Sequence, residues 1–179
     1  MADHELVGPF PAGADPETYD RARRRILWAM PSGLYVLGSA AGGRRNLMTL
    51  NWATQVATKP KMVAVSVEVP ALTHALVRDG RSFSLNILSR DDRPIVRKFV
   101  KPVDDTGEPG ELGGFEVKTA ATGSPILAKA LAWLDCEVRH EVPLESHTVF
   151  LGEVVDCGGE TTDDAEVLRL EDTRMSYGG

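Results

Sequence analysis

The chain has 179 residues, of which 42% are hydrophobic and 26% are charged, and its formal net charge is −6 at pH 7. This length and this composition are typical of a globular protein with one core. The negative charge argues against a general affinity for nucleic acid or acidic membranes. No apolar run approaches the roughly 20 residues needed to cross a bilayer, and the polar, acidic N-terminus is unlike a signal peptide.

The sequence contains two cysteines, Cys136 and Cys157. They are too few for a disulfide framework, and they show no metal-ligand spacing. We therefore expect reduced thiols, no metal site and a cytoplasmic location. Cys136 lies in a predicted strand, and we expect it to face the core as an inert thiol.

The N-terminal part divides into an arm and a helix. Residues 1–14 are rich in Pro, Gly and Asp, which predicts a flexible arm. Asp15-Pro16 is typical of a helix start, and the helix would run to about Met30 with Ile26 and Leu27 on its apolar side. The arginines at positions 21 and 23–25 could form a phosphate or nucleic-acid patch, but a solvated helix face is the favoured interpretation.

The remaining sequence, 15–179, is predicted to form one mainly β (α+β) domain. Strands are expected at 34–38, within 46–58, and at 62–67, 83–88, 132–138 and 148–154, and helices at 72–80 and 90–100. The apolar run at 62–67 favours a strand buried on both faces, and Gly80 favours a glycine-terminated helix. About six antiparallel strands predict a closed barrel, because closure removes the sheet edges.

Residues 101–124 are irregular and rich in Pro, Gly and Asp. A loop of this length inside a compact domain is usually functional or mobile. It could cover a site, or it could contact a second subunit.

The most unusual stretch is 46–60, which places Thr49, Asn51, Thr54 and Gln55 around Trp52 beside an apolar run. Burying such polar groups unpaired would cost about 1–3 kcal/mol each. Water or a polar ligand must therefore satisfy them. In the alternative interpretation, Thr54 and Gln55 satisfy each other at a barrel rim.

In chain order, the sequence resembles the flavin reductase-like domain family with its FMN-binding split barrel. The matching pieces are Ser32–Leu37, Met48–Val56 with Pro60, Thr73-His74, Phe83–Leu88, Gly123–Leu127 with Ala132–Cys136, and His147–Val154. The resemblance covers about Asp15 to Glu153 and implies an antiparallel Greek-key split barrel. Glu145-Ser146 stands where the family has Gly-Asp before the histidine, so the shape of this turn differs from the family pattern.

The resemblance implies that the domain binds FMN, or alternatively FAD, and accepts hydride from NAD(P)H. An isoalloxazine ring needs hydrogen-bonding groups along an apolar wall, and its phosphate needs donors, for which Lys101 is a further candidate. His147 would lie near the reactive face of the flavin, as the candidate catalytic residue that binds nicotinamide. The implied cofactor-binding residues are Met48, Thr49, Asn51, Trp52, Ala53, Thr54, Gln55, Glu68, Thr73, His74, Lys98 and Phe99.

Three functional hypotheses remain open at this point. The first is an NAD(P)H-dependent flavin reductase that supplies reduced flavin, for example to a monooxygenase partner. The second is an oxidoreductase with bound FMN that reduces another small acceptor. The third is a non-catalytic FMN- or haem-binding split-barrel protein. The resemblance also implies a homodimer in which the partner chain contributes to the flavin pocket.

Overall fold

The computed structural model describes residues 6–160 and 164–175. It contains two α-helices, ten strands and three short 3₁₀ helices in that part of the chain. In order these are α1 (Pro16–Trp28), β1 (Tyr35–Ala41), β2 (Arg44–Leu50), β3 (Ala53–Thr58), β4 (Lys61–Glu68), α2 (Leu72–Gly80), β5 (Ser82–Ile87), η1 (Arg90–Asp92), η2 (Ile95–Phe99), β6 (Glu111–Leu112), β7 (Phe115–Lys118), β8 (Ile126–Leu127), β9 (Ala132–Pro143), β10 (His147–Gly159) and η3 (Leu170–Asp172).

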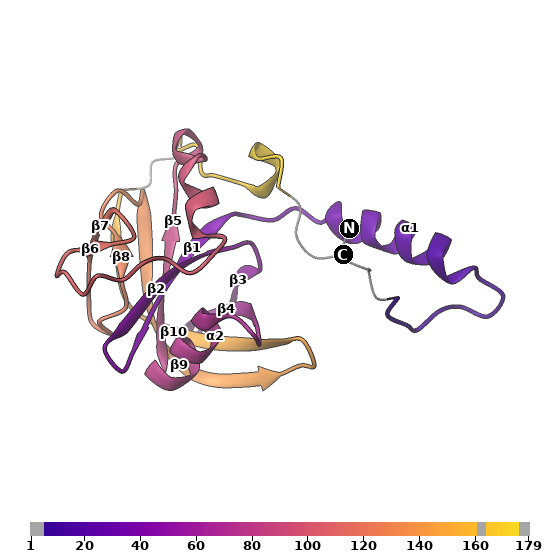
Figure 1. Cartoon of the computed structure of the whole chain (residues 1–179), viewed down its shortest axis with the longest axis horizontal. Coiled ribbons are helices and arrows are strands. Elements are labelled where there is room, and N and C mark those ends of the chain that lie inside the picture. The colour runs from indigo at the N-terminus through magenta and orange to yellow at the C-terminus, as the bar shows by residue number, and fades with distance from the viewer. Residues whose placement is uncertain (1–5, 161–163, 176–179) are drawn as a thin grey trace.

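Seven strands form one antiparallel sheet in the order β2-β1-β5-β9-β10-β4-β3 (Figure 1). The mainly β prediction is confirmed, but the expected closure is not. In the described part of the chain β2 and β3 each have one strand neighbour, so they are the two edges of an open sheet. Although only Asn51 and Trp52 separate these strands, they do not pair with each other, and β3 pairs with β4 instead.

The main core lies against one face of this sheet. It contains Leu37, Leu50, Val63, Val65, Val67, Val77, Phe83, Leu85, Cys136, Val138 and Phe150. On β4 the three valines are buried, whereas the residues between them are only partly buried. The prediction that this strand is buried on both faces is therefore wrong, and the alternation is that of a half-buried strand.

A second buried cluster lies between the β1–β2 hairpin, η2 and the C-terminal segment, and Leu168 is fully buried within it. The predicted helix over 90–100 is wrong. The chain forms the short helices η1 and η2 instead, with Pro94 between them, where a proline cannot donate a backbone hydrogen bond.

Helix α2 begins and ends differently from a standard capped helix. Its N-cap residue, Ala71, offers no side-chain hydrogen bond to the first turn. At the other end Gly80 is the last helical residue, and Arg81 adopts the left-handed conformation with φ of 55°. We expected a glycine to terminate this helix. Instead Gly80 is still helical, and the left-handed residue that ends the helix is Arg81.

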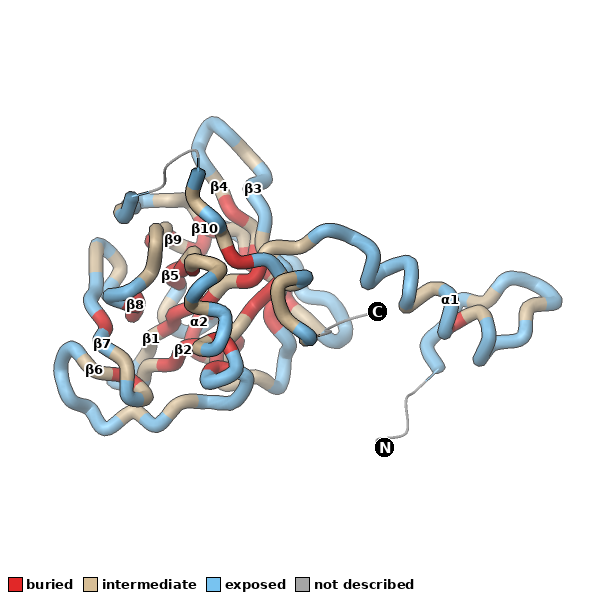
Figure 2. Tube along the Cα trace, turned by 90° about the horizontal axis from the view of Figure 1, so that it is seen from above, coloured by how far each residue is buried: buried red, intermediate tan, exposed pale blue. Residues whose placement is uncertain are grey.

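Helix α1 extends away from the sheet (Figure 1), and most of its surface is exposed (Figure 2). Asp15 caps it as predicted, with its carboxylate accepting a hydrogen bond from the Thr18 amide at 2.9 Å. The expected apolar side is not covered, since Ile26 is 71% exposed and Met30 65%. Asp20 is buried between Arg23 and Arg24, which favours a structural role for these two arginines.

Two connecting segments are held by specific bonds. The arm at residues 6–14 contacts α1, because Arg23 donates to the carbonyls of Val7 and Pro9. Within 101–124, Asp105 pairs with Arg45 of β2 through both carboxylate oxygens. No helix in the described ranges is long and apolar enough to cross a membrane.

Two titratable groups of the core have shifted pKa values. Burial raises the pKa of the Cys136 thiol to about 12, as the predicted inert cysteine requires. His74 of α2 is also buried, with Nε2 2.8 Å from the Thr148 hydroxyl and its ring against Phe150. Burial, and then the charge of Arg78, lower the pKa of His74 below 6.5.

This shift predicts a loss of stability in mild acid. Below pH 6.5 the unfolded chain binds a proton that native His74 does not bind, so the free energy of unfolding falls as the pH falls toward the native pKa. Each unit of difference in pKa corresponds to about 1.4 kcal/mol. When the pH is lowered from neutral to below 6.5, we expect the melting temperature of His74→Gln to fall less than that of the wild type. The melting temperature of His140→Gln, a change at an exposed histidine, should fall as much as that of the wild type. Equal pH dependence in wild type and His74→Gln would contradict this.

Candidate flavin site

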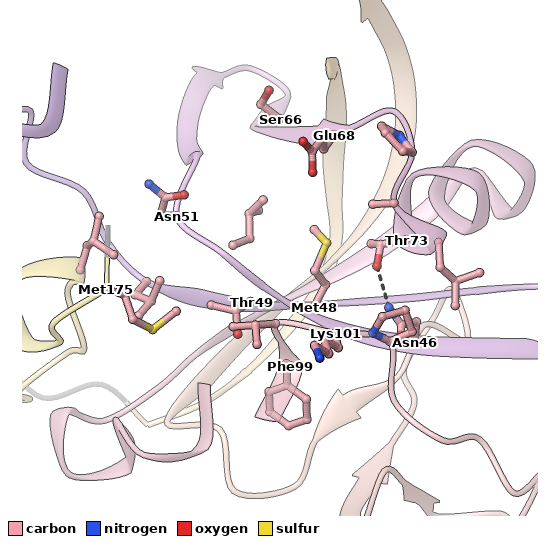
Figure 3. A pocket seen from close by; sticks show the side chains of 18 residues that line it. Asn46, Met48, Thr49, Asn51, Ser66, Glu68, Thr73, Phe99, Lys101 and Met175 are labelled. Atoms are coloured by element: carbon pink, nitrogen blue, oxygen red, sulfur yellow. Dashed lines mark hydrogen bonds between the residues drawn. The ribbon is translucent and has the colours of Figure 1, made fainter. Parts of the chain in front are cut away.

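A pocket of about 380 Å³ lies where β2, the start of α2, the end of η2 and the C-terminal segment meet (Figure 3). It has mainly apolar walls with several polar groups between them, the composition typical of a small-molecule site. Its lining residues are Leu34, Asn46, Met48, Thr49, Leu50, Asn51, Ser66, Glu68, Pro70, Ala71, Leu72, Thr73, Phe99, Val100, Lys101, Pro102, Leu170 and Met175.

One end of the pocket is suited to an anion. The uncapped N-terminus of α2 lines it, and such a terminus carries free amide donors and a partial positive charge. Thr73 lies in the first turn, and its hydroxyl oxygen accepts from Asn46 Nδ2 at 2.8 Å. The Thr73 hydroxyl proton is therefore directed to another acceptor. Lys101 adds a full positive charge at the same end (Figure 3).

The rest of the pocket is suited to a flat ring with a polar edge. Asn51 is only 7% exposed, and its carboxamide has no hydrogen-bond partner among the described residues. Ser66 lines the same region from β4 (Figure 3). Thr49, in contrast, donates its hydroxyl proton to the Val96 carbonyl, so it can act toward a ligand only as an acceptor. Leu34, Leu50 and Met48 supply apolar surface between these polar groups.

Six of the predicted site residues line this pocket: Met48, Thr49, Asn51, Glu68, Thr73 and Phe99. Trp52 and His147 lie outside its lining but beside each other, with ring centroids 5.0 Å apart. Trp52 is 38% exposed, and His147 Nδ1 is 2.8 Å from the Ser146 hydroxyl. The structure thus pairs an indole and an imidazole from the ends of β3 and β10.

The other predicted residues point elsewhere. Ala53, Thr54 and Gln55 lie on the edge strand β3, where the latter two are exposed. Their side chains bond to their own strand: the Thr54 hydroxyl reaches the Gln55 carbonyl, and the Gln55 amide reaches the Ala57 carbonyl. His74 faces the core, and Lys98 is exposed on η2 and does not line the pocket.

Sequence reasoning missed two sets of pocket residues. Asn46 bonds to Thr73 and accepts from the Val103 amide at 3.0 Å, so it links β2, α2 and the loop after η2. Asn46 could have been identified from the sequence, because it is a polar residue at a position where the strand pattern predicts a buried side chain. Leu170 and Met175 come from the far end of the sequence, and no local pattern places them beside β2.

The types of hydrogen-bonding and apolar groups that line the pocket fit a flavin mononucleotide. The α2 N-terminus, Thr73 and Lys101 line one end, and Ser66, Glu68 and Asn51, whose carboxamide has no hydrogen-bond partner among the described residues, lie beside apolar walls. No cluster of three or more His, Cys, Asp or Glu side chains that could hold a metal ion occurs within 6–160 and 164–175.

Comparison with known proteins agrees with this chemistry. The chain is 30% identical over 149 residues to a ferric-chelate reductase (NAD(P)H) of Archaeoglobus fulgidus, covering 82% of this chain and 86% of that protein. It is 31% identical over 137 residues to the NADH-dependent flavin reductase StyB of Pseudomonas fluorescens, covering 75% and 76%. The chain spans about a quarter of the length of the cyanobacterial diflavin flavoproteins that it also matches, 24% for that of Thermosynechococcus vestitus.

The fold has solved counterparts. One is BorF, the flavin reductase component of a bacterial two-component tryptophan halogenase, with a TM-score of 0.70 and 26% identity over 83% of this chain and 92% of that one. The sequence profile of the flavin reductase like domain matches residues 27–178. That match covers all the residues that line the pocket, and the chain therefore belongs to the flavin reductase-like domain family.

Proposed function

We propose that this protein binds FMN, with FAD as the alternative, and passes hydride from NAD(P)H through the flavin to an acceptor. The observation that carries the proposal is the pocket, in which the uncapped α2 N-terminus and Thr73 stand at one end and the unpaired Asn51 carboxamide stands among apolar walls. Family membership and the reductase relatives support the same assignment.

Each part of the pocket has a defined task. Thr73, the α2 amides and Lys101 hold the flavin phosphate, and Asn51 and Ser66 bond the polar edge of the ring. The apolar walls exclude water from the ring. When bound, the flavin supplies the centre that accepts and releases hydride. His147 and Trp52, whose rings are tilted by 51° and lie side by side, orient the nicotinamide.

The acceptor is a small molecule or free flavin. The relatives favour two classes: a metal chelate, as the name of the A. fulgidus protein states, and a flavin passed to a separate oxygenase or halogenase, as BorF exemplifies. A monooxygenase partner and a cytoplasmic location belong to this proposal. Residues 15–179 form the catalytic domain, preceded by the arm at 1–14.

Replacing Thr73 tests the phosphate end. We expect Thr73→Val to weaken FMN binding about tenfold or more, because one charge-assisted hydrogen bond is lost. Thr73→Ser restores the hydroxyl and should bind FMN nearly as well as the wild type. Fluorescence titration with FMN measures both, and thermal unfolding without FMN separates a folding defect from lost affinity. Thr58→Val, an exposed threonine on β3, is the matched control.

The absorbance of the purified protein after NADH or NADPH addition tests the activity. The expected result is bleaching of the flavin band by the coenzyme, followed by return of the band at a rate that depends on the added acceptor. Retained FMN that neither coenzyme reduces would favour the non-catalytic hypothesis. A protein that neither retains nor reduces FMN or FAD would overturn the proposal.

We further propose that the protein is a homodimer. The exposed apolar side of α1 supports this, since Ile26, Leu27 and Met30 lie in water in the single chain together with Trp28, which is 46% exposed. Such a patch on a protruding helix is typical of an interaction surface. A second copy covers it, in an isologous contact.

Charged substitutions on α1 test the dimer. We expect Ile26→Glu/Met30→Glu to shift the sedimentation coefficient from dimer to monomer, because two carboxylates would be placed in an apolar contact. Val155→Glu, on an exposed position of β10, should leave the dimer intact. A wild-type protein that sediments as a monomer at micromolar concentration would contradict the proposal.

A further inference from the structure

A second hollow, of about 430 Å³, lies beside the pocket and is rich in arginine. Its lining residues are Arg93, Pro94, Arg97, Asp172, Thr173 and Arg174, and we call it the arginine hollow. All three arginines are exposed, and none forms an ion pair with a residue that the structure describes. The net charge of the chain is −6, whereas the surface around this hollow is locally positive, because three arginines without ion pairs to described residues line it.

The single carboxylate in the hollow is already engaged. Asp172 Oδ2 accepts from the Arg169 amide at 2.9 Å, and its Oδ1 lies 2.9 Å from Arg90 Nε. These two partners lower the pKa of Asp172, so it stays ionised and paired near neutral pH. The positive charge of the three arginines is therefore not neutralised from within the hollow.

Two segments of the chain contribute residues both to the arginine hollow and to the flavin pocket. On η2, Arg97 lines the hollow and Phe99 lines the pocket, and on the C-terminal segment Arg174 lines the hollow and the adjacent Met175 lines the pocket. In Figure 3, Met175 lies at the end of the pocket away from Thr73 and Lys101. On the C-terminal segment, the hollow thus adjoins the end of the pocket opposite the proposed site of the flavin phosphate.

The wall that carries Arg174 is firmly attached. Leu168 is fully buried, its amide donates to the Leu88 carbonyl at 2.9 Å, and its carbonyl accepts from the Leu34 amide at 3.3 Å. The Leu170 amide donates to the Ser32 carbonyl at 3.1 Å. Arg90 also pairs with Glu166 at 3.0 Å. These contacts hold the C-terminal segment in place, so the arginines that line the hollow come from the η2 region and from an anchored C-terminal segment.

We propose that the arginine hollow binds a phosphate group of the reduced nicotinamide dinucleotide while its nicotinamide lies over the flavin. Guanidinium groups bind phosphate oxygens through paired, charge-assisted hydrogen bonds, and several of them suit a doubly charged group. Two groups of the coenzyme have this chemistry: the pyrophosphate of NADH and NADPH, and the 2′-phosphate of NADPH alone. The inference rests on the proposed reductase function.

The test replaces two arginines, one from each wall. In Arg97→Gln/Arg174→Gln we expect the KM for coenzyme to rise about tenfold with kcat within about twofold, because binding is weakened without change at the ring. A rise for both NADH and NADPH assigns the pyrophosphate, and a rise for NADPH alone assigns the 2′-phosphate. Unchanged KM values for both coenzymes would overturn the proposal. Arg78→Gln, which removes an exposed arginine of α2, is the control for loss of positive charge outside the hollow.

A binding measurement decides the matter without turnover. Calorimetric titration of the wild type with inorganic pyrophosphate and with 2′,5′-ADP should give saturable binding that the double variant loses and Arg78→Gln keeps. Absence of binding of both probes at millimolar concentration, or equal binding by the double variant, would refute the site. If the protein reduces flavin but gives either of these two binding results, only the proposal about the arginine hollow is refuted. A protein that binds no flavin refutes the proposed function.

Discussion

The buried carboxamide of Asn46 is the interaction on which the pocket depends. Its nitrogen donates to Thr73 and its oxygen accepts from the Val103 amide, so one side chain joins the edge strand β2, the start of α2 and the segment that follows η2. Asn46 is 2% exposed, and unpaired amide groups at such a position would each cost about 1–3 kcal/mol. Both bonds are satisfied only when the three segments meet, which ties the shape of the pocket to the fold.

Much of the fold follows from local sequence patterns. Asp15-Pro16 predicted the start of α1, and alternating apolar residues predicted strand β5 to within one residue at each end. The alternation also predicts one exposed face for this strand, and that is wrong, because every residue from Ser82 to Asn86 is buried. The failures have physical causes. Pro94 interrupts the helical pattern at 90–100, and the apolar side of α1 follows the helical period although it remains exposed.

Only part of the candidate site could be predicted from the sequence, and the reason is related. The polar stretch at 46–60 is continuous in sequence, but it bends at Asn51-Trp52 into two strands at opposite edges of the sheet. Its first half faces the pocket, whereas Thr54 and Gln55 face solvent. The opposite walls, around Lys101 and Met175, come from segments that are joined to β2 only by tertiary contacts. No pattern within a single strand can place such segments.

Strand β3 is a free edge with a nearly continuous exposed surface, and free edges invite pairing with other chains. Several features of this edge oppose such pairing. The pairing register with β4 slips between Gln55 and Ala57, which twists the edge, and the turn that follows holds Lys59, Pro60 and Lys61. A bulge, two lysines and a proline oppose strand-by-strand addition. Association of two copies would therefore use side-chain packing on α1, and this edge of the sheet would remain protected from fibre-like growth.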